Sequence, residues 1–111
     1  MRESMTRTSR FVERVFTERE RAYCDSKRAA AYQSYAARFA AKEAFLKALK
    51  TGWRGKIRWQ DIEVISGPDG VPSLMIYNEA EKLMHELGAS TVHISISHTK
   101  DHAVAQVILE K

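Results

Sequence analysis

The sequence predicts an α+β fold, with N-terminal helices that include one long helix, then an antiparallel sheet of about four strands with one inserted helix. Residues 1–50 contain no glycine or proline and are rich in Ala, Arg and Glu, which favours helices. The second half alternates apolar with polar residues around the turn signal at 67–70, which favours strands. The length of 111 residues predicts a single domain, residues 1–111.

In the first half, two helices are expected. Thr17 and Glu20 have the spacing of a capping box, which begins a short helix. This helix ends before the polar segment 24–26, which has good N-cap chemistry of its own. One long helix of up to 25 residues then runs from this segment to Lys50, and Gly52 stops it.

The second half begins with a predicted hairpin. Residues 57–64 read as a strand whose apolar phase slips once near 60–61, as a β-bulge would cause. The sequence Gly-Pro-Asp-Gly at 67–70 is a strong turn signal, and the returning strand covers 74–77.

A short helix and a second hairpin follow. Asn78 is expected to cap the helix, Glu81 to complete a capping box, and Gly88 to end it. The alternating segments 92–97 and 103–109 then predict two half-buried strands joined by a polar loop.

The net charge of +4 is unevenly distributed. Residues 1–56 carry 14 Lys and Arg against 6 Asp and Glu, whereas residues 57–111 carry 4 against 8. A basic half indicates an acidic partner, which could be a nucleic acid, an anionic membrane, a phosphorylated ligand or an acidic protein. No apolar run approaches the roughly 18 residues of a membrane span, so no membrane insertion is expected. The single cysteine, Cys24, and the charged segment 1–10 favour a cytoplasmic protein.

One carboxylate of the long helix stands out on a helical wheel. The face expected to be buried consists of Tyr32, Tyr35, Ala36, Phe39, Ala40 and Leu46. Glu43 falls in the middle of this face, and Lys47 lies on it one turn later. Two interpretations stay open: an i,i+4 ion pair of Glu43 with Lys47, or a carboxylate ligand for Mg²⁺ beside substrate phosphates. Arg38 and Lys42 flank the face, either as solvated charges or as groups that reach phosphate oxygens.

Three other segments carry residues with functional chemistry. Segment 50–56 interleaves small residues with cations, which either lets backbone amides approach an anion or simply ends the helix. Segment 95–100 places hydroxyls and an imidazole at the end of a strand, as a ligand-binding loop or an ordinary polar hairpin would. Segment 10–14 presents two arginines and Phe11 within about one helical turn, either as a solvated face or as a docking patch for an acidic helix.

Together, five blocks of sequence resemble the holo-acyl-carrier-protein synthases, which are 4′-phosphopantetheinyl transferases. The blocks are RFVERVFT at 10–17, RFAAKEAF at 38–45, WQDIEV at 59–64, SISHT at 95–99 and AVAQV at 103–107. Their order and separations match as well, so the resemblance covers nearly the whole chain from about Ser9.

The resemblance implies an enzyme that moves 4′-phosphopantetheine from coenzyme A to a serine of apo-acyl carrier protein. It implies a need for Mg²⁺, release of adenosine 3′,5′-bisphosphate and a role in fatty acid biosynthesis. It also implies a homotrimer with each active site at a subunit interface. The acidic partner is then the carrier protein, and no nucleic acid is expected.

The resemblance further assigns roles to residues by position. Glu43 matches the metal-binding glutamate, and the implied catalytic residues are Glu43, Lys47 and His98. The residues implied to bind coenzyme A are Arg38, Lys42, Thr51, Gly52, Ser97, His98 and Thr99. The residues implied to dock the carrier protein are Arg10, Phe11 and Arg14. Which group deprotonates the carrier serine stays open between Glu43 and a metal-bound water.

Two features depart from the family pattern. The family normally opens with a strand of the form G-x-G-x-D-x-x-E, whose aspartate is the other protein ligand to Mg²⁺, whereas this chain opens with MRESMTRTSR. We therefore expect either a truncated N-terminus or a metal site with one carboxylate fewer. The second case keeps open a non-catalytic relative that binds carrier protein or coenzyme A, and the basic half keeps open a nucleic-acid-binding module. Lys50 also stands where the family usually has glycine.

Overall fold

The computed structural model describes residues 9–49, 57–98 and 102–111. The elements in chain order are α2 (Ser9–Val15), α3 (Glu18–Ser26), η1 (Arg28–Ala30), α4 (Ala31–Ala48), η2 (Trp59–Asp61), β1 (Ile62–Ser66), β2 (Pro72–Ile76), α5 (Asn78–Glu86), β3 (Thr91–His98) and β4 (Ala103–Glu110). The predicted α+β class and the order of helices before strands are confirmed. Within the described part of the chain, the four strands form two antiparallel pairs, β1–β2 and β3–β4, where one sheet was predicted.

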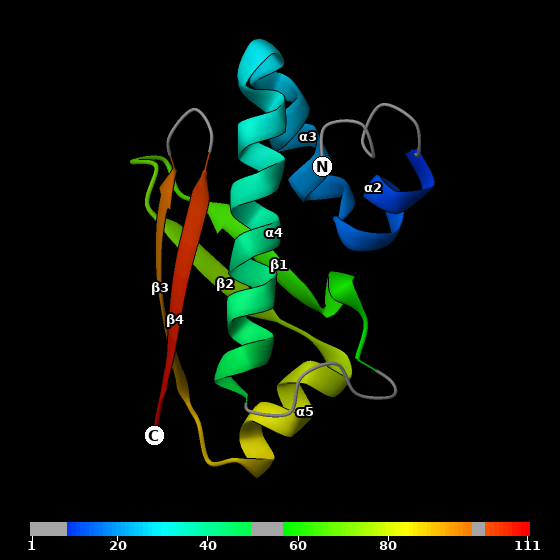
Figure 1. Ribbon diagram of the computed structural model, residues 1–111. Helices are drawn as coiled ribbons and strands as arrows, with labels where there is room; N and C mark the ends of the chain where they lie inside the picture. The colour runs from blue at the N-terminus through cyan, green and yellow to red at the C-terminus, as the bar shows by residue number, and fades with distance from the viewer. Residues whose placement is uncertain (1–8, 50–56, 99–101) are drawn as a thin grey trace.

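The central element is α4, which packs against α3, β1, β3 and β4 (Figure 1). In Figure 1 the β3–β4 hairpin lies on one side of this helix and α3 with α2 on the other, while α5 lies near its C-terminal end. One core cluster joins Phe45 and Leu46 of α4, and Leu49 directly after it, to β1 and α5, with half-buried side chains from β2, β3 and β4. A second cluster surrounds Phe16 and Tyr35 near the start of α4.

The predicted capping box at the start of α3 is confirmed. The Thr17 hydroxyl accepts the Glu20 N–H at 3.1 Å, and Glu20 Oε1 accepts the Thr17 N–H at 2.9 Å. The predicted break at 24–26 is wrong, because α3 continues through Ser26. Cys24 keeps this segment helical, since its fully buried side chain packs in the core and accepts the Ser34 hydroxyl at 3.2 Å. The long helix is therefore shorter than expected, at 18 residues.

The predicted buried face of the long helix is correct at Tyr35 and Leu46 and wrong at the other four positions, which are half-buried. The buried residues of α4 are Tyr35, Ala37, Arg38, Ala41, Lys42, Phe45 and Leu46. Glu43 and Lys47 are exposed. Large apolar residues alone do not set the rotation of this helix, because Tyr32 and Phe39 are only half-buried. Two charged residues, Arg38 and Lys42, turn inward because the core supplies partners for them.

A 3₁₀ turn stands where a β-bulge was predicted. The turn η2 places Asp61 in the interior, where its carboxylate accepts the Arg58 N–H at 3.0 Å and the Asn78 side-chain amide at 2.9 Å. Asn78 therefore does not cap α5 as predicted; Tyr77 occupies the N-cap position and makes no side-chain cap. The side chain of Asn78 binds Asp61 instead, and its backbone is left-handed with φ of 54°.

The strands β2, β3 and β4 follow the predicted alternation, whereas β1 does not, because Glu63 is buried between Ile62 and Val64. The predicted turn at 67–70 is confirmed: the Gly70 N–H donates to the Gly67 oxygen at 2.9 Å, and Gly70 takes a φ of 83° that suits glycine. In the second hairpin, Thr91 pairs with Glu110 and His98 with Ala103. The predicted end of α5 at Gly88 is also confirmed, with φ of 80°.

Three stretches fall outside the described residues: 1–8, 50–56 and 99–101. The expectation about an opening strand concerns the first of these, and the predicted small-residue loop after α4 is the second. No helix in the described ranges is long and apolar enough to cross a bilayer.

Candidate functional site

Lys42, which directly precedes Glu43 in the sequence, is buried in the core. Its ammonium nitrogen is 2.8 Å from Glu20 Oε1, and both side chains are 0% exposed. The same nitrogen donates to the carbonyl oxygens of Ile62 and, at 3.1 Å, Trp59. Burial lowers the pKa of the Lys42 amine, and the charge of Glu20 opposes this shift. Lys42 is thus a buried partner of Glu20, and in this arrangement its amine does not reach a bound phosphate.

The ion pair belongs to a larger buried network. Glu20 Oε2 accepts the Val64 N–H at 2.8 Å, so the first turn of α3 is bonded to β1. Glu63 is 5% exposed and accepts the hydroxyls of Thr17 and, at 2.7 Å, Tyr77. The bond to Glu63 raises the pKa of Tyr77. This network holds α3, α4 and β1 together, and the capping box was its one signal in the sequence.

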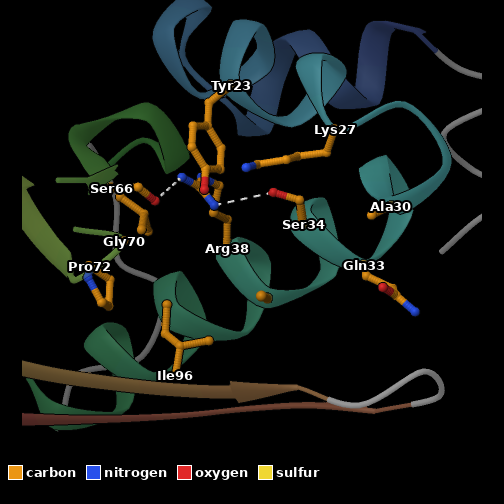
Figure 2. Close-up of a pocket in the computed structure, with 12 residues that line it drawn as sticks. Tyr23, Lys27, Ala30, Gln33, Ser34, Arg38, Ser66, Gly70, Pro72 and Ile96 are labelled. Carbon is orange, nitrogen blue, oxygen red and sulfur yellow. Dashed lines mark hydrogen bonds between the residues drawn. The ribbon is translucent and has the colours of Figure 1, made fainter. Parts of the chain in front are cut away.

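Arg38 lines a cavity of about 340 Å³ between α3, α4, β1 and β3 (Figure 2). Arg38 is only 5% exposed, and its guanidinium donates to Ser66 Oγ at 2.8 Å and Ser34 Oγ at 3.3 Å. The guanidinium carbon lies 4.1 Å from the centre of the Tyr23 ring, and the Lys27 nitrogen lies 4.7 Å from the same ring. Arg38 Nε is buried and has no hydrogen-bond partner among the described residues.

The chemistry of this cavity favours an anion. Its lining includes the cations Lys27 and Arg38 but no acidic residue. The hydrogen bond with Ser66 lowers the pKa of Tyr23, burial opposes this shift, and the two cations assist it. Arginine presents a planar set of donors that matches phosphate oxygens. Of the residues that form this cavity, the sequence had indicated only Arg38; Tyr23, Lys27, Ser34 and Ser66 were missed.

Glu43 lies on a different face of α4 from Arg38. At about 100° per residue, five residues turn the helix by roughly 140°, so the exposed Glu43 carboxylate points away from the Arg38 cavity. The ion pair with Lys47 is not formed, and the Glu43 carboxylate has no hydrogen-bond or ion-pair partner among the described residues. No group of three or more His, Cys, Asp or Glu that could hold a metal occurs in the part of the chain that the structure describes.

The chemistry of Glu43 still fits Mg²⁺ as one ligand of a shared site. Magnesium is commonly held by one or two carboxylates together with waters and substrate phosphates. A site with one protein carboxylate needs its other oxygen ligands from water, from the substrate or from a second protein chain. In this chain, Glu43 is the candidate for the carboxylate ligand.

The arginines of the predicted docking patch, Arg10 and Arg14, are exposed on α2. Phe11 is half-buried, with its ring 6.1 Å from that of Phe39, and the Phe39 ring is in turn 5.2 Å from that of Trp59. These aromatic contacts hold α2 against α4 with its two arginines facing outward.

The remaining predicted site residues lie at the end of the β3–β4 hairpin and after α4. Ser97 is exposed and pairs with Val104. His98 pairs with Ala103 through its backbone, while its side chain is outside what the structure describes. Thr51, Gly52 and Thr99 also fall outside the described residues.

Comparisons with known proteins point to one family. Residues 2–107 match the model of the 4′-phosphopantetheinyl transferase superfamily. A holo-acyl-carrier-protein synthase from Koribacter versatilis is 48% identical over 101 residues, which is 91% of this chain and 80% of that relative. The crystal structure of the synthase from Neisseria meningitidis is 32% identical, with a TM-score of 0.85, and the match covers 99% of this chain and 87% of the other. The Helicobacter pylori synthase in complex with coenzyme A is 28% identical, with a TM-score of 0.77 over 98% of this chain and 85% of the other.

Proposed function

Since the chain belongs to the 4′-phosphopantetheinyl transferase superfamily and is an enzyme of the holo-acyl-carrier-protein synthase type, we propose that it transfers 4′-phosphopantetheine from coenzyme A to a serine of apo-acyl carrier protein. The proposal takes the chain as a single cytoplasmic domain that supports fatty acid biosynthesis. On the structural side, the observation that carries it is the cavity around Arg38, which has two cations and no acidic residue in its lining.

Arg38 is our candidate for binding a phosphate group of coenzyme A. Its guanidinium is held in place by Ser34 and Ser66, so little side-chain entropy is lost when an anion binds. The solved relative from Helicobacter pylori is a complex with coenzyme A, which supports this choice of ligand. Lys42, which the resemblance also implied, is left out of the binding set because it is buried against Glu20.

The transfer itself requires positioning and neutralisation of charge. The serine oxygen of the carrier protein forms a bond to the phosphorus of the phosphopantetheine, the bond to adenosine 3′,5′-bisphosphate breaks, and the serine proton passes to a base, for which Glu43 and a water molecule are the candidates. Glu43 would hold Mg²⁺, which when bound neutralises charge on the pyrophosphate. Lys47 lies exposed one turn after Glu43 and adds positive charge on the same side of α4. The further candidates at this site are Thr51, Gly52, Ser97, His98 and Thr99.

We also propose a homotrimer with active sites at the subunit interfaces. Glu43 and the Arg38 cavity lie on different faces of α4, so one copy of the chain does not bring them together. A second copy that covers the Glu43 face would supply the oxygens and cations that Glu43 lacks in its own chain.

The test is transfer to purified apo-acyl carrier protein, followed by the mass gain of the carrier. The wild type should need Mg²⁺ and stop in EDTA. Glu43→Ala should lower kcat by at least about a hundredfold, since a bound cation supplies several kcal/mol to such a step. Glu86→Ala removes an exposed carboxylate from α5 and serves as the matched control.

If Glu43→Ala transfers the group as fast as Glu86→Ala, Glu43 has no role in the active site. An absence of transfer by the wild type would refute the function. Coenzyme A binding that persists in EDTA without product would instead indicate a non-catalytic relative.

A further inference from the structure

A second cavity, of about 560 Å³, lies between the end of α2 and the turn η2. Its lining residues are Glu13, Arg14, Arg58, Trp59 and Gln60. The cavity thus begins at Arg14, the last residue of the predicted docking patch, and continues to a second arginine that is 44 positions later in the sequence. Nothing in the sequence pattern joined Arg58 to that patch.

The charges of this cavity are those of an anion-binding surface. Arg14 and Arg58 are both exposed, and neither has an ion pair with a described residue. Glu13 is the one acidic residue in the lining. Two exposed guanidinium groups around one hollow attract carboxylates, to which each can bind through two parallel hydrogen bonds.

The two arginines are held on a fixed frame. The Gln60 side-chain amide donates to the carbonyl oxygens of Glu13 and, at 3.2 Å, Phe16, so η2 is bonded to the end of α2. The Arg58 N–H donates to the buried carboxylate of Asp61 at 3.0 Å. Because both backbones are held, the spacing of the two arginine backbones is preset, and a partner has to order only their side chains.

We propose that Arg58 is a docking residue for the acyl carrier protein and that it extends the docking patch of Arg10, Phe11 and Arg14 across this cavity. The inference rests on the proposed function, because that function supplies the acidic protein partner. The cavity is continuous with the patch through Arg14, and its charge is complementary to an acidic helix. An acidic side chain on that helix would enter the hollow between Arg14 and Arg58.

The test compares steady-state kinetics of transfer by Arg58→Ala, Arg58→Glu and Arg58→Lys. The KM for apo-acyl carrier protein should rise about threefold in Arg58→Ala and about tenfold in Arg58→Glu, and should rise less in Arg58→Lys than in Arg58→Ala, because lysine keeps the charge but loses the paired hydrogen bonds. The KM for coenzyme A and kcat at saturating carrier protein should not change. The effect should shrink as salt is raised from low ionic strength, since rim charges are screened.

Lys82→Glu is the matched control, because it makes the same change of charge at an exposed position of α5. In Arg58→Glu the new carboxylate could disturb the nearby Asp61. Arg58→Ala introduces no charge and therefore tests the same interaction without this effect. Equal KM values for carrier protein in Arg58→Glu and Lys82→Glu would overturn the inference while transfer by the wild type still upholds the function. An equal rise in the KM for coenzyme A would also overturn it. So would competition by a DNA or RNA duplex that depends on Arg58, because this would assign the surface to nucleic acid.

Discussion

The buried position of Lys42 gives a direct test of what this residue does. The substitution Lys42→Met keeps a long unbranched side chain in the core but removes the ammonium group that pairs with Glu20. A residue that serves the protein by binding phosphate at the surface would tolerate this change. A residue that balances a buried carboxylate would not.

The expected loss follows from the contacts of Glu20. Without Lys42, this carboxylate is buried with hydrogen bonds only from the N–H groups of Thr17, at 2.9 Å, and Val64, at 2.8 Å. Removing one partner of a buried ion pair typically costs about 3–5 kcal/mol. The two remaining donors place this case near the lower end, at about 3 kcal/mol. That is a large share of the roughly 5–15 kcal/mol by which small domains are stable.

The measurement is urea unfolding followed by circular dichroism. A loss of about 3 kcal/mol should lower the unfolding midpoint by about 1–3 M urea, given the usual slopes for small proteins. Lys47→Met makes the same substitution at an exposed position of the same helix and should change stability by less than about 0.5 kcal/mol. The pair Glu20→Gln with Lys42→Met should cost less than the sum of the single changes, because no uncompensated charge stays buried.

Equal midpoints for Lys42→Met and Lys47→Met would refute this reasoning. Lys42 would then be free to bind phosphate, as the resemblance implied. Equal midpoints together with a raised KM for coenzyme A in Lys42→Met would show that Lys42 belongs among the residues that bind coenzyme A.

Two other predictions concern the Arg38 cavity and the alkaline limit of stability. Arg38→Ala should raise the Kd for coenzyme A by about ten- to a hundredfold in calorimetry, because charge-assisted hydrogen bonds contribute about 1.5–3 kcal/mol; a change below about twofold would remove this cavity from the coenzyme A site. Burial, followed by the hydrogen bond to Asp25, raises the pKa of Tyr35 above its ordinary value near 10. A raised pKa in the folded state contributes stability that is complete below about pH 10 and is lost as the pH rises toward the folded pKa. The unfolding free energy should therefore fall above about pH 10, and fall less steeply in Tyr35→Phe; parallel curves for the two proteins would contradict this.

The parts of the fold that were predicted correctly depend on neighbours in sequence. The capping box of Thr17 with Glu20 and the turn at 67–70 require only residues within one turn of the chain, so their patterns were sufficient. The errors at 24–26 and at Asn78 have a different cause. At 24–26 the buried side chain of Cys24 keeps the segment in the helix, and Asn78, which suits a helix cap, binds the buried carboxylate of Asp61 instead. Such contacts depend on residues far away in sequence.

In the candidate site, too, the features that sequence neighbours determine were predicted, and those that depend on distant residues were not. The rotation of α4 buries Phe45 and Leu46 in the core together with the charged residues Arg38 and Lys42, which find partners there. Lys42 finds Glu20, which is 22 positions earlier and is itself fixed by the cap of α3. Because consecutive residues differ by about 100°, burying Lys42 turns the next residue, Glu43, toward the exterior. The ion pair that removes Lys42 from the phosphate-binding set is therefore also the contact that presents Glu43 at the surface, as the proposed role of Glu43 at a subunit interface requires.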